Sequence, residues 1–147
     1  MIKYRKALVE EIDDLKKLLW TYGPNEWNYL TQEGVDDEFK LVKNGTALVY
    51  VATFEKKIIG FSVLIDGTEA PTYLRKYCSG DDMCFVGDVV VSSLYSGKGI
   101  ATQLLENCLN EAKSKGAKVV LIERHEENLG SAGMMKKAGF AVVDTFY

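Results

Sequence analysis

Residues 89–101 have the sequence VVVSSLYSGKGIA, and this stretch decides the fold. Its first residues end an apolar run from Cys84 to Val91, which predicts a strand buried on both faces. A turn with two glycines follows, and an apolar stripe at helical spacing then begins at Ala101. Gly116 stands where a helix C-terminal cap is expected, and residues 119–122 predict another buried strand. A strand, a helix and a strand in this order predict a parallel pair with a crossover helix.

The chain before this stretch predicts a mixture of helices and strands. An apolar stripe predicts a helix that stops at Gly23, and its members are Leu8, Ile12, Leu15, Leu19 and Tyr22. A second helix is expected over residues 33–43, with Val35, Phe39 and Val42 facing inward. Strands are expected over residues 2–7, 47–54 and 58–65. Residues 66–84 predict a long loop, which is either functional or a solvated insertion. After residue 122 we expect a helix over 129–138 and a last strand over 140–147.

Composition bounds the class of protein. The chain has 147 residues and a formal net charge of −3, which predicts one domain over residues 1–147 without the basic excess typical of nucleic-acid binders. No apolar run approaches the roughly 20 residues that span a bilayer, and no signal peptide is visible. Three cysteines and one histidine, without a Cys-x-x-Cys motif, predict reduced thiols in a cytoplasmic protein and no metal site. We therefore expect neither a nucleic acid nor a membrane as a partner.

The two glycines of the turn, Gly97 and Gly99, predict a site for a phosphate. Glycines let the backbone approach a ligand, and a helix N-terminus offers free N–H groups with a partial positive charge. A Walker A loop is excluded because its Gly-x-x-x-x-Gly-Lys-Ser/Thr pattern is missing. A dinucleotide fingerprint fails as well, because Thr102 occupies the place of its third glycine. An ordinary glycine-containing turn remains the alternative on this segment alone.

Two segments resemble the GNAT superfamily of N-acetyltransferases. Residues 96–101, SGKGIA, are similar to the coenzyme A loop of that family, whose pattern is Gln/Arg-x-x-Gly-x-Gly/Ala after an apolar strand. A second family pattern, Asn-x-x-Ala followed by apolar residues, Tyr and Gly-Phe, resembles the residues Asn128, Ala132, Met134, Met135, Ala138, Gly139 and Phe140. The expected order of elements is also similar to that of the family.

The resemblance implies an α/β (α+β) GNAT fold. Its mixed central sheet would have antiparallel N-terminal strands and a parallel, splayed pair, with helices on both faces. The family's C-terminal hairpin would be shortened, since only eight residues, 140–147, remain for it. Either this last strand pairs directly with strand 119–122, or an open edge awaits a partner, and a homodimer is one expectation.

The resemblance also implies the reaction and the binding residues. Acetyl-CoA would be the cosubstrate, and its acetyl group would move to a primary amine of a small molecule or peptide. The backbone of Val89 and Val91 would bind the pantetheine arm, and Asn128 would lie near the arm or its thiol end. The pyrophosphate would be held by the N–H groups of Gly97, Lys98, Gly99, Ile100, Ala101 and Thr102, with the Lys98 side chain as an added cation.

The chain departs from the family where the chemistry is expected. Met135 occupies the place of the usual Tyr proton donor, and a thioether cannot donate a proton. Gly87 occupies the place of the first acid of a common pair, and Ser96 that of the long polar side chain that opens the loop. A coenzyme A-binding domain with little or no catalysis therefore stays an alternative.

The candidates for the general base are Asp88, Glu123 and His125. Asp88 is alternatively a structural carboxylate, and His125 an exposed loop residue. The possible replacement proton donors are Tyr73, Tyr77, Tyr95 and Tyr147, although Tyr95 is also expected to pack under the glycine loop.

Overall fold

The structure is a computed structural model that describes residues 1–24, 30–124 and 128–143. Its strands form one five-stranded sheet in the order β1-β2-β3-β4-β5. The strands are β1 (Lys3–Lys6), β2 (Ala47–Phe54), β3 (Lys57–Asp66), β4 (Met83–Val91) and β5 (Val119–Leu121). The helices are α1 (Ile12–Tyr22), α2 (Gln32–Lys43), α3 (Ile100–Ser114) and α4 (Leu129–Lys137).

The sheet is mixed, as the resemblance implied. Strands β1 to β4 pair antiparallel with their neighbours, whereas β5 pairs parallel with β4. The connection from β4 to β5 runs through α3, because parallel neighbours need a long crossover that brings the chain back to the same end of the sheet.

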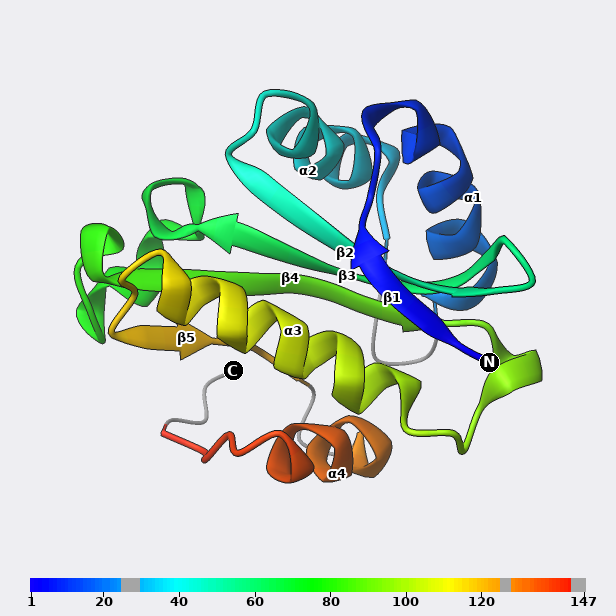
Figure 1. The fold of residues 1–147 in the computed structure, drawn as a ribbon. Coiled ribbons are helices and arrows are strands. Elements are labelled where there is room, and N and C mark those ends of the chain that lie inside the picture. The colour runs from blue at the N-terminus through cyan, green and yellow to red at the C-terminus, as the bar shows by residue number, and fades with distance from the viewer. Residues whose placement is uncertain (25–29, 125–127, 144–147) are drawn as a thin grey trace.

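Helices cover both faces of the sheet. Helices α1 and α2 lie on one face and α3 and α4 on the other (Figure 1). The residues that pack between the sheet and α1 and α2 include Leu15, Leu19, Val35, Phe39, Phe61, Val63 and Val90. Those that pack between the sheet and α3 and α4 include Leu64, Cys84, Val86, Leu105, Cys108 and Met135. The inward positions expected on the second helix are thus confirmed, and Cys84 and Cys108 are core residues.

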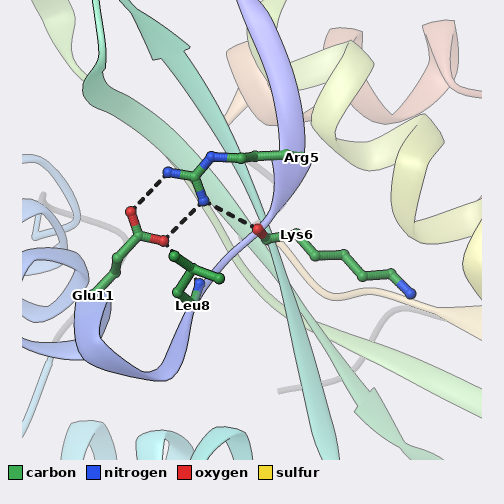
Figure 2. Close-up of polar contacts among 4 residues, drawn as sticks. All are labelled: Arg5, Lys6, Leu8 and Glu11. Atoms are coloured by element: carbon green, nitrogen blue, oxygen red, sulfur yellow. Dashed lines mark hydrogen bonds and ion pairs between the residues drawn. The ribbon is translucent and has the colours of Figure 1, made fainter.

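The first helix starts later than its apolar spacing suggests. Leu8 was expected on its inner stripe, but its side chain is exposed, and the α-helix begins only at Ile12 after a 3-10 turn, η1 (Val9–Glu11). Figure 2 shows what holds this turn: the Arg5 guanidinium donates to both oxygens of Glu11, at 2.9 and 2.7 Å. The backbone N–H of Leu8 also donates to Glu11 Oε1, at 2.8 Å. Glu11 therefore binds the turn to β1.

The expected loop over residues 66–84 consists largely of three 3-10 turns, η2 (Gly67–Glu69), η3 (Thr72–Lys76) and η4 (Gly80–Asp82). Ala70 and Leu74 are buried in the core below α1 and α2. The segment is therefore packed onto the sheet, which contradicts a merely solvated insertion.

Two expectations at the C-terminal end were wrong. Strand β5 is three residues long and partly exposed, not buried, because β4 is its one neighbour among the described residues. The expected strand from Phe140 does not form over residues 140–143, where Val142 and Val143 are exposed, and residues 144–147 lie outside the described ranges. None of the helices in the described part of the chain is long and apolar enough to cross a membrane.

Candidate functional site

A cleft opens where β4 and β5 part. The two strands pair only from Met83 and Val119 to Phe85 and Leu121, whereas β4 continues to Val91. β5 ends at the last pair, and a cleft of about 1530 Å³ is lined by β4 on one side and by β5 and the residues after it on the other. Its walls are residues 85–91 of β4, residues 118–124 around β5, and side chains of α4. The backbone of Val89 and Val91 faces no neighbouring strand on this side among the described residues, which leaves an edge that an extended ligand can pair with.

The glycine turn leads from β4 to an open helix N-terminus. Gly97 and Gly99 have φ angles of 77° and 73°, in the left-handed region that favours glycine. Gly99 is the N-cap of α3 and has no side chain with which to cap this end of the helix. The first N–H groups of α3 therefore point out of the helix without a protein cap, as an anion site requires. Lys98 between the glycines is exposed.

The turn is anchored from below. The N–H of Ser92 donates to Ile59 O at 2.8 Å, and Ser92 Oγ accepts from the N–H of Leu94. The Tyr95 ring packs on Phe54 with ring centroids 5.8 Å apart, which confirms that Tyr95 lies under the turn. Ile100, the first residue of α3, is buried in the same cluster. The loop thus has a fixed position at the end of β4, beside the cleft.

A β-bulge at Gly87 sets the direction of Asp88. The register passes from Leu64 opposite Val86 directly to Val63 opposite Asp88, so that Gly87 is the extra residue. Residues opposite one another share a face of the sheet, and Val63 belongs to the core below α1 and α2. Asp88 therefore faces α1 and α2, and it also lines the cleft.

Glu38 of α2 is the functional candidate that sequence reasoning missed. Its carboxyl meets that of Asp88. Its Oε1 atom is shielded from solvent and has no hydrogen-bond partner among the described residues. The signal was present in the sequence, because a glutamate at position 38 lies on the same helical stripe as the inward-facing Val35, Phe39 and Val42.

The environment of this carboxyl pair disfavours its charge. Burial is the main cause that raises the pKa of Glu38, and the neighbouring Asp88 raises it further. Burial also raises the pKa of Asp88 above its ordinary value. No Lys or Arg of the described ranges contributes to either shift, so the pair is not part of an ion pair. Burial and the neighbouring carboxyl thus both favour the protonated form of Glu38.

Of the other two candidate bases, Glu123 lies within the described residues and His125 does not. Glu123 follows β5, lines the cleft and is exposed, and it accepts a hydrogen bond from the Tyr73 hydroxyl of η3. Burial first, and then this bond, raise the pKa of Tyr73 to about 12. Tyr73 therefore keeps its proton at neutral pH. His125 and Tyr147 lie outside the described residues.

Asn128 and Met135 lie on the α4 side of the cleft. Asn128 is the N-cap of α4, and its side-chain oxygen accepts from the N–H of Ser131 at 3.1 Å. Met135 is buried in the core formed with α3. The position that carries a Tyr donor in the resembling family is therefore an apolar packing position in this chain.

Comparison with known proteins places the chain in a family. The model of the acetyltransferase (GNAT) family matches residues 12–140. The chain belongs to the GNAT family. This family uses acetyl-CoA as its cosubstrate, and the residues matched include β4, the glycine turn and all of α4. A comparison with curated protein sequences returned no match.

Solved structures share the GNAT fold at low sequence identity. AAC(6′)-Iy, in complex with the bisubstrate analog CoA-S-monomethyl-acetylneamine, has a TM-score of 0.80 at 15% identity, over 100% of this chain and 95% of that one. A predicted acetyltransferase from Clostridium acetobutylicum with acetyl-CoA has a TM-score of 0.72 at 24% identity, over 100% and 94%. A ribosomal-protein-alanine N-acetyltransferase from Brucella melitensis has a TM-score of 0.71 at 16% identity, over 100% and 96%. These likenesses establish the GNAT fold.

Proposed function

We propose that this GNAT protein is an N-acetyltransferase that moves an acetyl group from acetyl-CoA to a primary amine of a small molecule or peptide. The observation that carries the proposal is the cleft between β4 and β5, which has the open N-terminus of α3 beside one end and Asp88 on its wall. One element of the site suits a phosphate and the other suits an ammonium group.

The coenzyme fits the α3 end of the cleft. Its pyrophosphate would accept hydrogen bonds from the N–H groups of residues 97–102, and Lys98 would add a mobile positive charge. The pantetheine arm would pair with the free backbone groups of Val89 and Val91, and its thiol end would lie toward Asn128. These contacts use backbone and position, which fits a chain that has Ser96 in place of the family's long polar side chain.

The acceptor amine has to lose a proton before it can attack. A free alkylamine has a pKa of about 10.4 and is an ammonium ion at neutral pH. Asp88 is the proposed base because it faces the cleft, and because its raised pKa makes it a stronger proton acceptor than an ordinary aspartate. The neutral nitrogen then bonds to the thioester carbonyl carbon, and the C–S bond breaks. The second proton of the nitrogen leaves, and the coenzyme sulfur takes up one proton to become a thiol.

The leaving sulfur needs less help than the amine. A thiol with a pKa of about 8.5 leaves readily as the thiolate, so a side-chain donor contributes less here than it would for an alkoxide. Met135 supplies none. In the proposed reaction a side-chain base therefore takes the proton of the amine, and solvent supplies the proton that the leaving sulfur takes up.

Calorimetry and an amine panel test the proposal. We expect coenzyme A to bind the purified protein and ATP and NAD not to bind, and we expect acetyl-CoA to be consumed with at least one class of primary amine. Tight binding of ATP or NAD instead of coenzyme A would overturn the assignment of the glycine turn. Coenzyme binding without turnover over a broad panel would favour the second candidate, a coenzyme A-binding domain with little catalysis, which the apolar packing of Met135 motivates.

A homodimer belongs to the same proposal. Within the described residues β5 has a neighbour on one side only, and Val142 and Val143 after α4 are exposed. A free strand edge beside exposed apolar residues is a surface that a second copy can cover. We expect light scattering coupled to size-exclusion chromatography to give twice the mass of one chain, and a clean monomer would reject the dimer.

A further inference from the structure

Glu38 occupies the space that a side chain at position 87 would need. A Cβ built on Gly87 would lie 2.5 Å from Glu38 Oε1 and 2.8 Å from Ile65 Cδ1. Real Cβ atoms do not approach an oxygen this closely, so any larger residue at 87 would displace the carboxyl. The φ angle of Gly87 is not positive, and the backbone conformation therefore does not demand glycine. A side chain at position 87 would have to displace the ends of the Glu38 and Ile65 side chains.

The bulge brings this space and Asp88 to the same face of the sheet. Gly87 is the extra residue of the bulge, and the contacts of its built Cβ are to α2 and to the α1/α2 side of β3. Asp88 faces the same helices. A carboxyl from α2 and one from β4 thus lie on one face of the sheet beside Gly87.

We propose that Glu38 is a positioning residue for the acetyl transfer: it shares one proton with Asp88 and takes the place of the carboxyl that position 87 lacks. The inference rests on the proposed function, in which Asp88 is the base. The pair carries one negative charge and one proton. When an ammonium group enters the cleft, its proton moves to the pair, which becomes neutral, and the free amine attacks the thioester.

Other charged groups near the cleft do not replace Glu38 in this role. The titratable side chains that line the cleft besides Asp88 are those of Tyr22, Lys118, Glu123, Arg124 and Lys136. None of them contributes to the pKa shift of either carboxyl, whereas Glu38 and Asp88 each shift the other. Among the described residues, Glu38 is therefore the side chain that shifts the pKa of Asp88, which burial raises.

Two substitutions at Glu38 and one control separate this role from packing. We expect Glu38→Gln to lower kcat at least tenfold at an unchanged Kd for coenzyme A, because an amide cannot share a proton with Asp88 as a carboxyl does. We expect the acidic limb of the kcat/KM profile to move to higher pH, because Asp88 loses the hydrogen bond from the Glu38 carboxyl that lowers its pKa. Glu38→Asp should retain part of the rate. Asp37→Asn, on the exposed side of the same helix, should leave both the rate and the profile unchanged. A Glu38→Gln variant with the wild-type rate and profile would overturn the inference.

Moving the carboxyl back to the strand is the sharper test. Gly87→Asp alone should impair turnover, since its side chain collides with Glu38. Glu38→Ala alone should impair it by removing the second carboxyl. We expect the double variant to be at least fivefold faster than Glu38→Ala alone, because the aspartate side chain then enters the vacated space. A double variant no faster than Glu38→Ala, at a comparable melting temperature, would contradict the inference.

A titration without substrate distinguishes failure of the pair from failure of the proposed function. In protein with 13C-labelled side-chain carboxyls, NMR should find one Asp or Glu carboxyl still protonated at pH 7. This signal should be missing in Glu38→Gln, and it should titrate at lower pH in Asp88→Asn, where Glu38 lacks the neighbouring carboxyl that raises its pKa. If the signal is present and no amine is acetylated, the proposed function is wrong and proton sharing stands. If amines are acetylated and wild-type protein lacks the signal, proton sharing is wrong and the proposed function stands.

Discussion

The Glu38 carboxyl occupies the space in which a side chain of residue 87 would lie, because a Cβ on Gly87 would be 2.5 Å from Glu38 Oε1. The strand has no side chain at this position, and the helix places a carboxyl in that space. A buried carboxyl without a cation is not a device for stability, because burial penalises its charged form. This relationship has consequences that unfolding experiments can measure.

Glu38→Gln should stabilise the protein, and more so at high pH. The pKa of Glu38 is raised by folding, so the unfolded chain releases its proton first and stability falls as pH rises above the unfolded value of about 4.3. Removing the charge removes that loss. We expect the free energy of unfolding to change little at pH 4 and to rise by about 1–3 kcal/mol at pH 8 in urea titrations. An equal effect at both pH values, or no difference from Asp37→Asn, would contradict the raised pKa.

We expect Gly99→Val to weaken coenzyme binding, and Gly116→Val is the control for the backbone strain that both substitutions introduce. Both glycines flank α3, with φ angles of 73° and 84°, and a Cβ on either would meet no atom within 4 Å. Each substitution should therefore cost about 1–2 kcal/mol of unfolding free energy through backbone strain alone. Only Gly99 lies at the open end of α3. We expect calorimetry to give an affinity for coenzyme A that is at least tenfold weaker for Gly99→Val and unchanged for Gly116→Val. Equal affinities of the two variants would contradict the proposal that this turn binds the phosphate.

Met135 should behave as a core residue and not as a chemical group. It is buried with Leu64, Cys84 and Val86 below α3 and α4. Met135→Ala should destabilise the protein by about 2–4 kcal/mol, whereas Met135→Leu should stay within about 1.5 kcal/mol. Turnover of the leucine variant should match that of the wild type. A large loss of rate at normal stability in Met135→Leu would assign the thioether a part in the reaction.

Glu11→Gln should remove stability above about pH 4 and have no effect near pH 2. The Arg5 guanidinium lowers the pKa of Glu11 to about 2, and the Leu8 N–H adds to the shift. A lowered pKa gives stability that is present above the unfolded value of about 4.3 and is lost as pH falls toward 2. Because the Arg5 side chain is largely exposed, we expect only about 0.5–1 kcal/mol at pH 7. Glu10→Gln is the matched control on the neighbouring exposed carboxylate; an equal loss there would assign the effect to net charge.

The sequence by itself determined the order of the elements and the coenzyme side of the site. Apolar spacing is local and depends on helix and strand periods, so it located α2, β2, β3, β4 and α3 close to their observed bounds. Gly97 and Gly99 adopt the left-handed backbone conformation that favours glycine. The helix that starts directly after them leaves its first N–H groups without partners inside the helix. A binding site made of backbone N–H groups can therefore be predicted from residue type and spacing.

Only the tertiary structure determined that Asp88 and Glu38 lie together and that β5 is partly exposed at the edge of the sheet. The bulge at Gly87 depends on how β4 pairs with β3, and that pairing turns Asp88 toward α2. Glu38 and Asp88 are 50 positions apart, and no spacing rule joins a helix residue to a strand residue that meets it only when α2 packs on the sheet. The exposure of β5 likewise depends on which strands lie beside it. A proton shared by two carboxyls requires contact, and contact between distant residues exists only in the folded chain.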